Sequence, residues 1–181
     1  MLAIRPLISG LLFLGILTGL LPLCAQAVPL SPDPQGFEGI PWGATFTESS
    51  EFALVEDTQH IKGYELKQGP LHLGGAQVDS MRFQTYNDKF VRVVIRYHSK
   101  SVHKQIVDYF QSQYGRLDHT PGQISKGPVQ QYNWQGDESE IVLRYEEMKD
   151  RGIIFFESRA FALSFSEGMM APDPDLGGAT Y

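Results

Sequence analysis

Residues 79–115 read DSMRFQTYNDKFVRVVIRYHSKSVHKQIVDYFQSQYG. In the first half of this stretch, apolar and polar side chains alternate. In the second half, apolar side chains recur every three or four positions. Alternation is typical of half-buried strands, and the longer spacing is typical of an amphipathic helix. The stretch therefore predicts a β-hairpin followed by a helix.

The helix is predicted over residues 100–114. Its apolar side chains share one helical face and comprise Val102, Ile106, Tyr109, Phe110 and Tyr114. Ser99 or Ser101 can cap its start. Gly115 follows its last residue, where glycine commonly takes a left-handed conformation. These signals predict one helix with a single buried face.

The register of the hairpin follows from its buried face. A two-residue turn at Asn87-Asp88 would place Phe83 opposite Arg92. A third loop residue, Lys89, shifts the partner of Phe83 to Val93. Because a shift of one residue moves every side chain to the other face, the apolar pairing is favoured. We therefore expect a three-residue loop.

Other elements are predicted on both sides of this stretch. The tetrapeptide Thr45-Phe46-Thr47-Glu48 matches a capping box and predicts a short helix toward Leu54. Residues 153–156 are apolar on both faces, which predicts a central strand covered on both sides or one face that meets a partner. Further strands are expected at residues 64–68, 71–73, 129–135, 140–147, 151–158 and 161–165.

The fold class predicted from these elements is α+β, with an antiparallel sheet packed by one long and one short helix. A helix followed by about three strands recurs in both halves, so a duplicated unit is a further expectation. Residues 37–166 are predicted to form the single domain. Proline and glycine indicate a flexible leader at residues 28–36 and a flexible tail at residues 167–181.

The first 27 residues have the three parts of a secretory signal peptide. Arg5 precedes an apolar run from Leu7 to Leu23, which ends at the cleavage tripeptide Ala25-Gln26-Ala27. The sequence therefore predicts cleavage after Ala27 and a periplasmic or secreted protein. Two alternatives stay open, namely an uncleaved anchor helix and lipid attachment at Cys24.

Cleavage would change both the thiol content and the charge of the chain. Cys24 is the single cysteine, so the cleaved domain would hold no disulfide, thiol nucleophile or cysteine-based zinc site. Without Arg5, the 15 basic residues become 14 against 21 acidic residues, a net charge of −7. This acidity disfavours nucleic-acid partners. Because no run of Lys and Arg is present, binding to a membrane after cleavage is not expected either.

Few residues stand out as candidates for a site. Nucleophile-elbow, P-loop, HExxH and dinucleotide motifs are absent, so we predict no catalytic, cofactor or metal site. His98 and His103 could be neighbours, but two histidines make half a zinc site at best. Trp42 and Trp134 are candidate interface aromatics, and the alternative is that both rings close the ends of the core.

A resemblance to known proteins implies the compartment in which the protein works, but it implies no activity. The motif Phe37-Glu38-Gly39-Ile40-Pro41-Trp42-Gly43, with Tyr114-Gly115 and Trp134, resembles small exported bacterial domains of unassigned function. The helix-then-sheet scheme is similar in topology to β-lactamase inhibitory protein and to small lipoproteins that assist outer-membrane protein assembly. The partner implied is an envelope protein or a small ligand.

These observations predict a non-catalytic binding or accessory domain of the cell envelope. The alternatives are a hydrolase or small-ligand-binding enzyme with dispersed site residues, and an envelope protein anchored by its first helix. An enzyme should have a deep pocket with a pKa-shifted group, whereas a binding domain should have a flat apolar patch.

Overall fold

The computed structural model describes residues 28–117 and 123–170. Its main element is an eight-stranded sheet in the order β1-β10-β11-β12-β9-β8-β5-β4. Neighbouring strands are antiparallel except β1, which runs parallel to β10. The strands are β1 Val28–Pro29, β4 Phe52–Asp57, β5 Ile61–Leu66, β8 Ser80–Tyr86, β9 Lys89–His98, β10 Val129–Gln135, β11 Ser139–Glu146 and β12 Arg151–Ser158.

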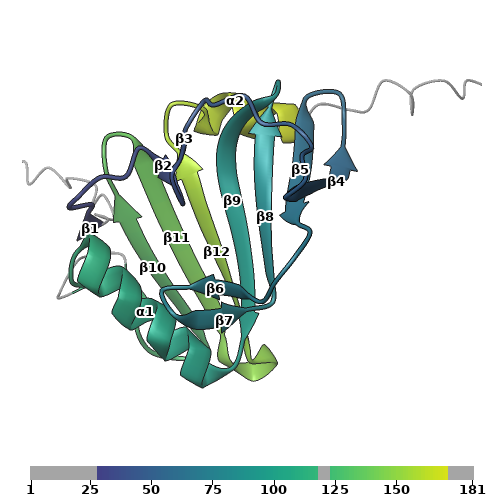
Figure 1. The fold of residues 1–181 in the computed structure, drawn as a ribbon. Helices are drawn as coiled ribbons and strands as arrows, with labels where there is room; N and C mark the ends of the chain where they lie inside the picture. The colour runs from purple at the N-terminus through teal and green to yellow at the C-terminus, as the bar shows by residue number, and fades with distance from the viewer. Residues whose placement is uncertain (1–27, 118–122, 171–181) are drawn as a thin grey trace, which may run out of the picture.

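The two faces of this sheet are covered differently (Figure 1). On the front face lie helix α1 (Lys100–Tyr114) and two small hairpins. The hairpin strands are β2 Gly36–Phe37, β3 Ile40–Pro41, β6 Leu71–Leu73 and β7 Ala76–Val78. Helix α2 (Ala162–Met170) lies behind one end of the sheet, and the short 3-10 helix η1 (Glu147–Lys149) joins β11 to β12.

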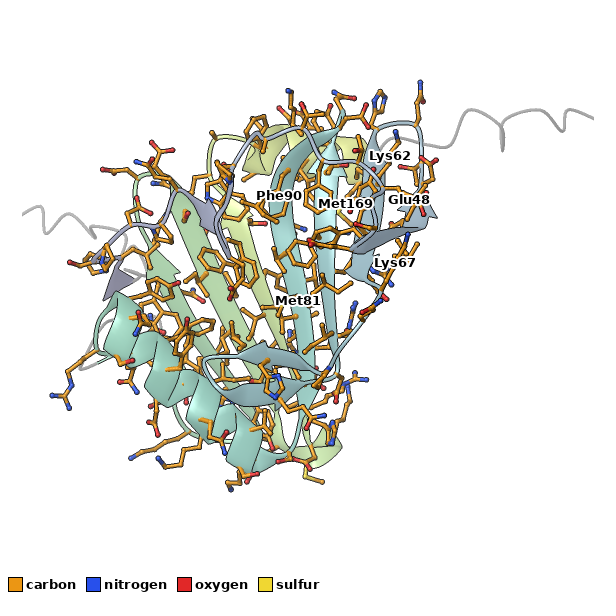
Figure 2. All side chains as sticks on the ribbon, in the orientation of Figure 1. Glu48, Lys62, Lys67, Met81, Phe90 and Met169 are labelled. Atoms are coloured by element: carbon orange, nitrogen blue, oxygen red, sulfur yellow. The ribbon has the colours of Figure 1, made fainter. Side chains whose placement is uncertain are left out.

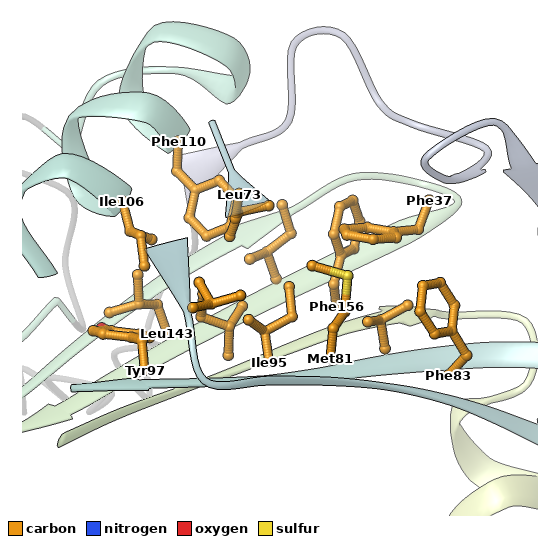
Figure 3. Close-up of a cluster of buried hydrophobic side chains, with 14 of the residues drawn as sticks. Phe37, Leu73, Met81, Phe83, Ile95, Tyr97, Ile106, Phe110, Leu143 and Phe156 are labelled. Atoms are coloured by element: carbon orange, nitrogen blue, oxygen red, sulfur yellow. The ribbon is translucent and has the colours of Figure 1, made fainter. Parts of the chain in front are cut away.

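The main hydrophobic core fills the space between the front face and α1. In Figure 3 the sheet is seen nearly edge-on, and the labelled side chains gather on the side where α1 lies. Ile106 and Phe110 of α1 are fully buried, as are Ile95 of β9 and Leu143 of β11. The front face of the sheet, α1 and the two small hairpins thus enclose the core.

The prediction of a helix at residues 100–114 is confirmed. At its start, Ser99 Oγ accepts a hydrogen bond from the backbone N–H of Val102 at 3.4 Å. At its end, Gly115 has φ 115°, in the region that favours glycine. The helix therefore begins after Ser99 and ends before Gly115, two of the cap residues predicted from the sequence.

The predicted register of the hairpin is confirmed, but the predicted loop is wrong. Phe83 pairs with Val93, as the buried face requires. The turn has only two residues, because Tyr86 pairs with Lys89 and both residues between them have positive φ, 49° and 60°. The extra residue is a β-bulge at Val91 instead, which restores the apolar register after the first two pairs beyond the turn.

The predicted α+β fold class is wrong, because the sheet dominates. Strands make up 48% of the structure and helices 19%, and both helices are short. Seven of the sheet strands have six or more residues. The helix expected between Thr45 and Leu54 does not form, so the helix-plus-three-strand unit is not duplicated.

Local turn chemistry and tertiary contacts explain the missing helix. Ser49 Oγ accepts hydrogen bonds from the N–H groups of Glu51 and Phe52, both at 3.2 Å, which closes a turn. Serine competes with helix formation through such bonds. Phe46 donates its backbone N–H to Asp88 O, and its ring is buried against the sheet. Strand β4 then begins at Phe52.

The prediction of a last strand at residues 161–165 is also wrong, because helix α2 forms there. Phe161 and Phe165 are four residues apart and share a helical face as well as a strand face. Phe165 is buried with Ile61 and Val91, whereas Leu163 is 71% exposed. Helical spacing accounts for this difference, since a strand would place all three on one face.

The segments predicted to be a flexible leader and a flexible tail instead carry ordered elements in their described parts. Residues 28–29 form β1, and the side chain of Leu30 is buried. Asp33 accepts hydrogen bonds from the N–H groups of Glu138 and Ser139 at 2.7 and 3.2 Å. At the other end, α2 continues to Met170. The rest of the predicted tail and the predicted signal peptide lie outside the described residues.

The outer edge of the sheet is β4, and it carries features that oppose strand addition. A β-bulge interrupts its pairing between Leu54 and Glu56. Lys67 lies beside Glu48 near this edge, with Nζ 3.6 Å from the carboxylate (Figure 2). Bulges and charges commonly protect exposed edges.

In the described part of the chain, neither helix is long and apolar enough to span a membrane.

Candidate functional site

The back face of the sheet carries a row of three side chains from adjacent strands. Arg144 of β11 pairs with Ile153 of β12, and Ile153 pairs with Arg96 of β9. Paired residues project to the same face of a sheet. An apolar side chain therefore lies between two arginines.

The next row toward the centre of the sheet is apolar. Val142 pairs with Phe155, and Phe155 pairs with Val94. Val94 is buried, whereas Val142 and Phe155 are half-buried. Together with Ile153, these three side chains form a strip, named the apolar strip below, which no described helix or hairpin covers.

A hollow of about 510 Å³ lies over one end of this strip. Ile153 and Phe155 contribute to its lining, and Arg96, Arg144 and Arg151 stand around it. Two carboxylates, Asp79 and Glu146, also reach it. The hollow is partly enclosed, and its volume is within the range of about 300–1,000 Å³ that small-molecule sites occupy, so it can receive a small ligand or one side of a larger partner.

Both carboxylates that line the hollow already form ion pairs with neighbouring side chains. Asp79 Oδ1 lies 2.6 Å from Nδ1 of His98. Glu146 lies 2.5 Å from Nζ of Lys149 and 3.6 Å from the guanidinium of Arg144. Among the described residues, the side chains of Arg96 and Arg151 have no hydrogen-bond or ion-pair partner. Positive charge therefore remains available for a partner.

Arginine is concentrated on this face. Five of the seven arginines after residue 27 project from it, although the chain as a whole is acidic. Three were just described as lining the hollow. The fourth, Arg82, pairs with Glu65 at 2.9 Å and Glu56 at 3.4 Å. We name Arg96, Arg144 and Arg151 the arginine cluster.

The fifth arginine, Arg92, holds α2 on the same face. Its guanidinium carbon lies 4.3 Å from the ring centre of Phe165 and 5.6 Å from that of Phe155. It also pairs with Glu157, and both side chains are only about 15% exposed. Burial, and then the nearby charge of Glu157, raise the pKa of Glu140. The end of the face near α2 is thus closed and the end near the hollow is open.

The two tryptophans proposed as interface aromatics lie elsewhere. Trp134 is fully buried in the main core, where its Nε1–H donates to Gly115 O at 2.9 Å. Trp42 is half-buried, packs on Phe90 and donates from Nε1 to Ser139 Oγ at 2.8 Å. Both rings face the front of the sheet and belong to the core or its margin.

The two histidines proposed as neighbours lie apart. His98 is exposed beside Asp79, whereas His103 is buried on the inner face of α1. The ring of His103 stacks on Tyr145 with centroids 4.2 Å apart. Among the described residues, no group of three or more His, Cys, Asp or Glu side chains could hold a metal ion.

Both nitrogens of His103 are hydrogen bonded inside the core. Nε2 lies 3.1 Å from Gln130 Oε1, an oxygen that also accepts from Tyr132, so Nε2 carries the proton. Nδ1 then accepts from the hydroxyl of Tyr97 at 2.8 Å. Burial lowers the pKa of His103. The side chain is therefore a neutral structural group that faces away from the arginine cluster.

The stability of the protein is expected to fall as the pH drops below about 6.5, the pKa of an unfolded histidine. Since the pKa of His103 is lowered in the folded state, the unfolded state binds the proton more readily. Urea unfolding of wild type and His103→Gln at pH 7.5 and 5.5 would measure this. We expect a smaller pH effect in the variant, and an equal effect in both proteins would contradict the assignment.

Several predicted residues remain outside the structure. Ala25 and Ala27, at the expected cleavage site, and Cys24, the alternative lipid site, precede the described residues.

The arginine cluster was missed in the sequence because its members are spread over three strands. The alternation that places Arg92 and Arg96 on one face was a signal that could have led to it.

Comparison of this chain with protein-family models, curated proteins and solved structures found no match. The resemblance of residues 37–43 to exported bacterial domains therefore stays a prediction.

Proposed function

We propose that the protein is an exported binding domain of the bacterial cell envelope, and that the open end of its back face receives an anionic partner. Export is proposed from the pattern of residues 1–27. The partner surface is proposed from the apolar strip and the arginine cluster. The proposal includes no reaction catalysed by this chain.

One observation carries the proposal: in the described structure Arg96 and Arg151 have no hydrogen-bond or ion-pair partner, and they lie beside the half-buried apolar strip. Guanidinium groups pair with carboxylates and phosphates through two parallel hydrogen bonds. Arginine is also enriched in the centres of protein interfaces, next to apolar and aromatic side chains. The combination favours a partner that brings both negative charge and apolar surface.

The surroundings of the titratable groups favour binding over catalysis. His103 is enclosed by Tyr97, Tyr145 and Gln130 and does not line the hollow. Glu140, whose pKa is raised, lies near Glu157 at the closed end of the face. A general acid or base has to reach the proton it transfers. Neither group meets this requirement at the open hollow.

The proposal is tested by crosslinking from the face itself. Ile153 is replaced with the photo-crosslinking residue p-benzoylphenylalanine, the full chain is expressed in envelope-bearing cells, and irradiated extracts are analysed by mass spectrometry. A matched probe at exposed Ser112 of α1 reports random contacts. We expect a discrete adduct from position 153 only, which is lost when Arg96 and Arg144 are both changed to glutamate.

Two results would contradict the proposed function. The first is equal adducts from positions 153 and 112, which would indicate unspecific contact. The second is an adduct from position 153 that survives the R96E/R144E change. The double variant should keep its unfolding free energy within about 0.5 kcal/mol, since both side chains are exposed. Urea unfolding would verify that the loss is not caused by misfolding.

Export is tested by the mass of the protein recovered from the same extracts. We expect a chain that begins at Val28. A chain that begins at Met1 would indicate the anchor helix, and one that begins at a lipid-modified Cys24 would indicate a lipoprotein. The three outcomes differ by more than 100 Da, roughly the mass of one residue, so intact mass measurement separates them.

A further inference from the structure

We infer that the partner segment on the open face is an amphipathic helix with acidic side chains along its flanks, an inference that rests on the proposed function. The proposed function requires only an anionic partner. The width and length of the open face, and the pairing of its strands, favour a helical partner over an extended peptide.

The width of the site matches a helix. Arg144 and Arg96 lie on the two strands that flank β12, so they are two strand spacings apart, or about 10 Å. An α-helix with its side chains is about 10–12 Å wide. A helix along β12 would therefore rest on Ile153 and Phe155. Its two flanks would face Arg144 and Arg96.

The length of the site matches two to three helical turns. From Arg151 to Phe155, β12 advances about 13 Å at roughly 3.3 Å per residue. A helix covers about 13 Å with roughly nine residues. Beyond Phe155 the face is closed by Arg92, which lies against Phe165 of α2. The partner helix would thus fill the part of the face that α2 leaves open.

Helix α2 shows that this face accepts a helix by the same kind of contact. Phe165 of α2 packs on Val91 and Ile61 of the sheet. An arginine of the sheet, Arg92, stacks against its ring. At the open end, the apolar strip would take the place of Val91 and Ile61, and the arginine cluster that of Arg92. The partner supplies the carboxylates.

The pairing of the strands disfavours an extended peptide. Strands β11, β12 and β9 are interior strands, and each is hydrogen bonded to neighbours on both sides. An added strand needs an unpaired edge. One edge of the sheet, β4, lies three strands beyond β9 and is interrupted by its bulge. On the other side of the sheet, the outer side of β10 is already hydrogen bonded to β1, Gln123 and Ile124. A partner on the open face therefore binds through side chains, as a helix does.

The inference is tested by selection from a displayed library of 14-residue segments, in which each position is chosen from Ala, Leu, Phe, Gln, Lys and Glu. Wild-type protein is the bait, and binders of R96E/R144E are removed. We expect enriched segments with apolar residues at i, i+3, i+4 and i+7 and glutamate beside them. Synthetic versions should bind R96E/R144E at least tenfold more weakly than wild type. A control variant, K104E/K126E, makes the same charge change away from the face and should bind like wild type.

Other outcomes overturn the inference and separate it from the proposed function. Enriched segments with alternating apolar residues, or without glutamate, would exclude the acidic helix. In parallel, vesicles of phosphatidylglycerol and a soluble polyglutamate chain are tested as anionic probes without helical pattern. If only these bind and R96E/R144E abolishes their binding, the anionic face stands and the helix is wrong. If no probe distinguishes wild type from R96E/R144E, both proposals fail.

Discussion

Replacing Trp134 with alanine is expected to lower the free energy of unfolding by about 3–5 kcal/mol. The indole ring is fully buried and lies 5.5 Å from the ring of Phe110, which joins β10 to α1. Its removal leaves a large cavity and a carbonyl, Gly115 O, without its donor. Urea unfolding followed by far-UV circular dichroism measures the loss.

Two further variants separate the causes of this loss. Trp134→Phe keeps a ring but not the donor, so it should cost less than alanine. Trp42→Ala removes a half-buried ring from the margin of the core and should also cost less. If Trp134→Ala costs under about 1 kcal/mol, Trp134 does not anchor the core, and a role at an interface would have to be considered again.

Replacing Gly152 with alanine is expected to cost about 3 kcal/mol, through the overpacking of a filled core. A Cβ at this position would lie 2.0 Å from Cζ of Tyr97, on the strand next to β12. The tyrosine ring would have to move, and its hydroxyl would lose the hydrogen bond to His103 Nδ1. Urea unfolding of the variant measures the cost.

A double-mutant cycle assigns this cost to the clash. Tyr97→Ala removes the atoms that a Cβ at position 152 would meet. In that background, Gly152→Ala should cost less than about 1 kcal/mol, because the two sites are coupled through one contact. An equal cost in both backgrounds would mean that Gly152 is required for a different reason.

Local patterns predicted the parts of the fold whose partners are near in the chain. The helix at residues 100–114 and the register of the preceding hairpin follow from periodicity, and both are confirmed. The segment from Thr45 to Leu54 was predicted wrongly because its structure depends on distant groups. Phe46 is held by the hairpin turn at Asp88, and no capping pattern contains that information.

The candidate site depends even more on distant pairing. The alternation in β9 places Arg96 and Val94 on one face, and the alternation in β11 does the same for Arg144 and Val142. Joining the two sets requires that β12 lies between β9 and β11. The apolar run at residues 153–156 indicated a central strand or a partner face, and β12 is central with one face partly open. Its neighbours were not predictable from spacing alone.

The position of β12 also governs how the protein folds. This strand is the last of the sheet in chain order, yet it joins the strands that precede α1 to those that follow it. Until residue 158 is available, β9 and β11 both present unpaired edges, which other chains can pair with. Pairing between distant segments slows folding, so such edges persist longer. During synthesis, the sheet of this protein is therefore completed late, and the chain is most exposed to aggregation just before β12 inserts.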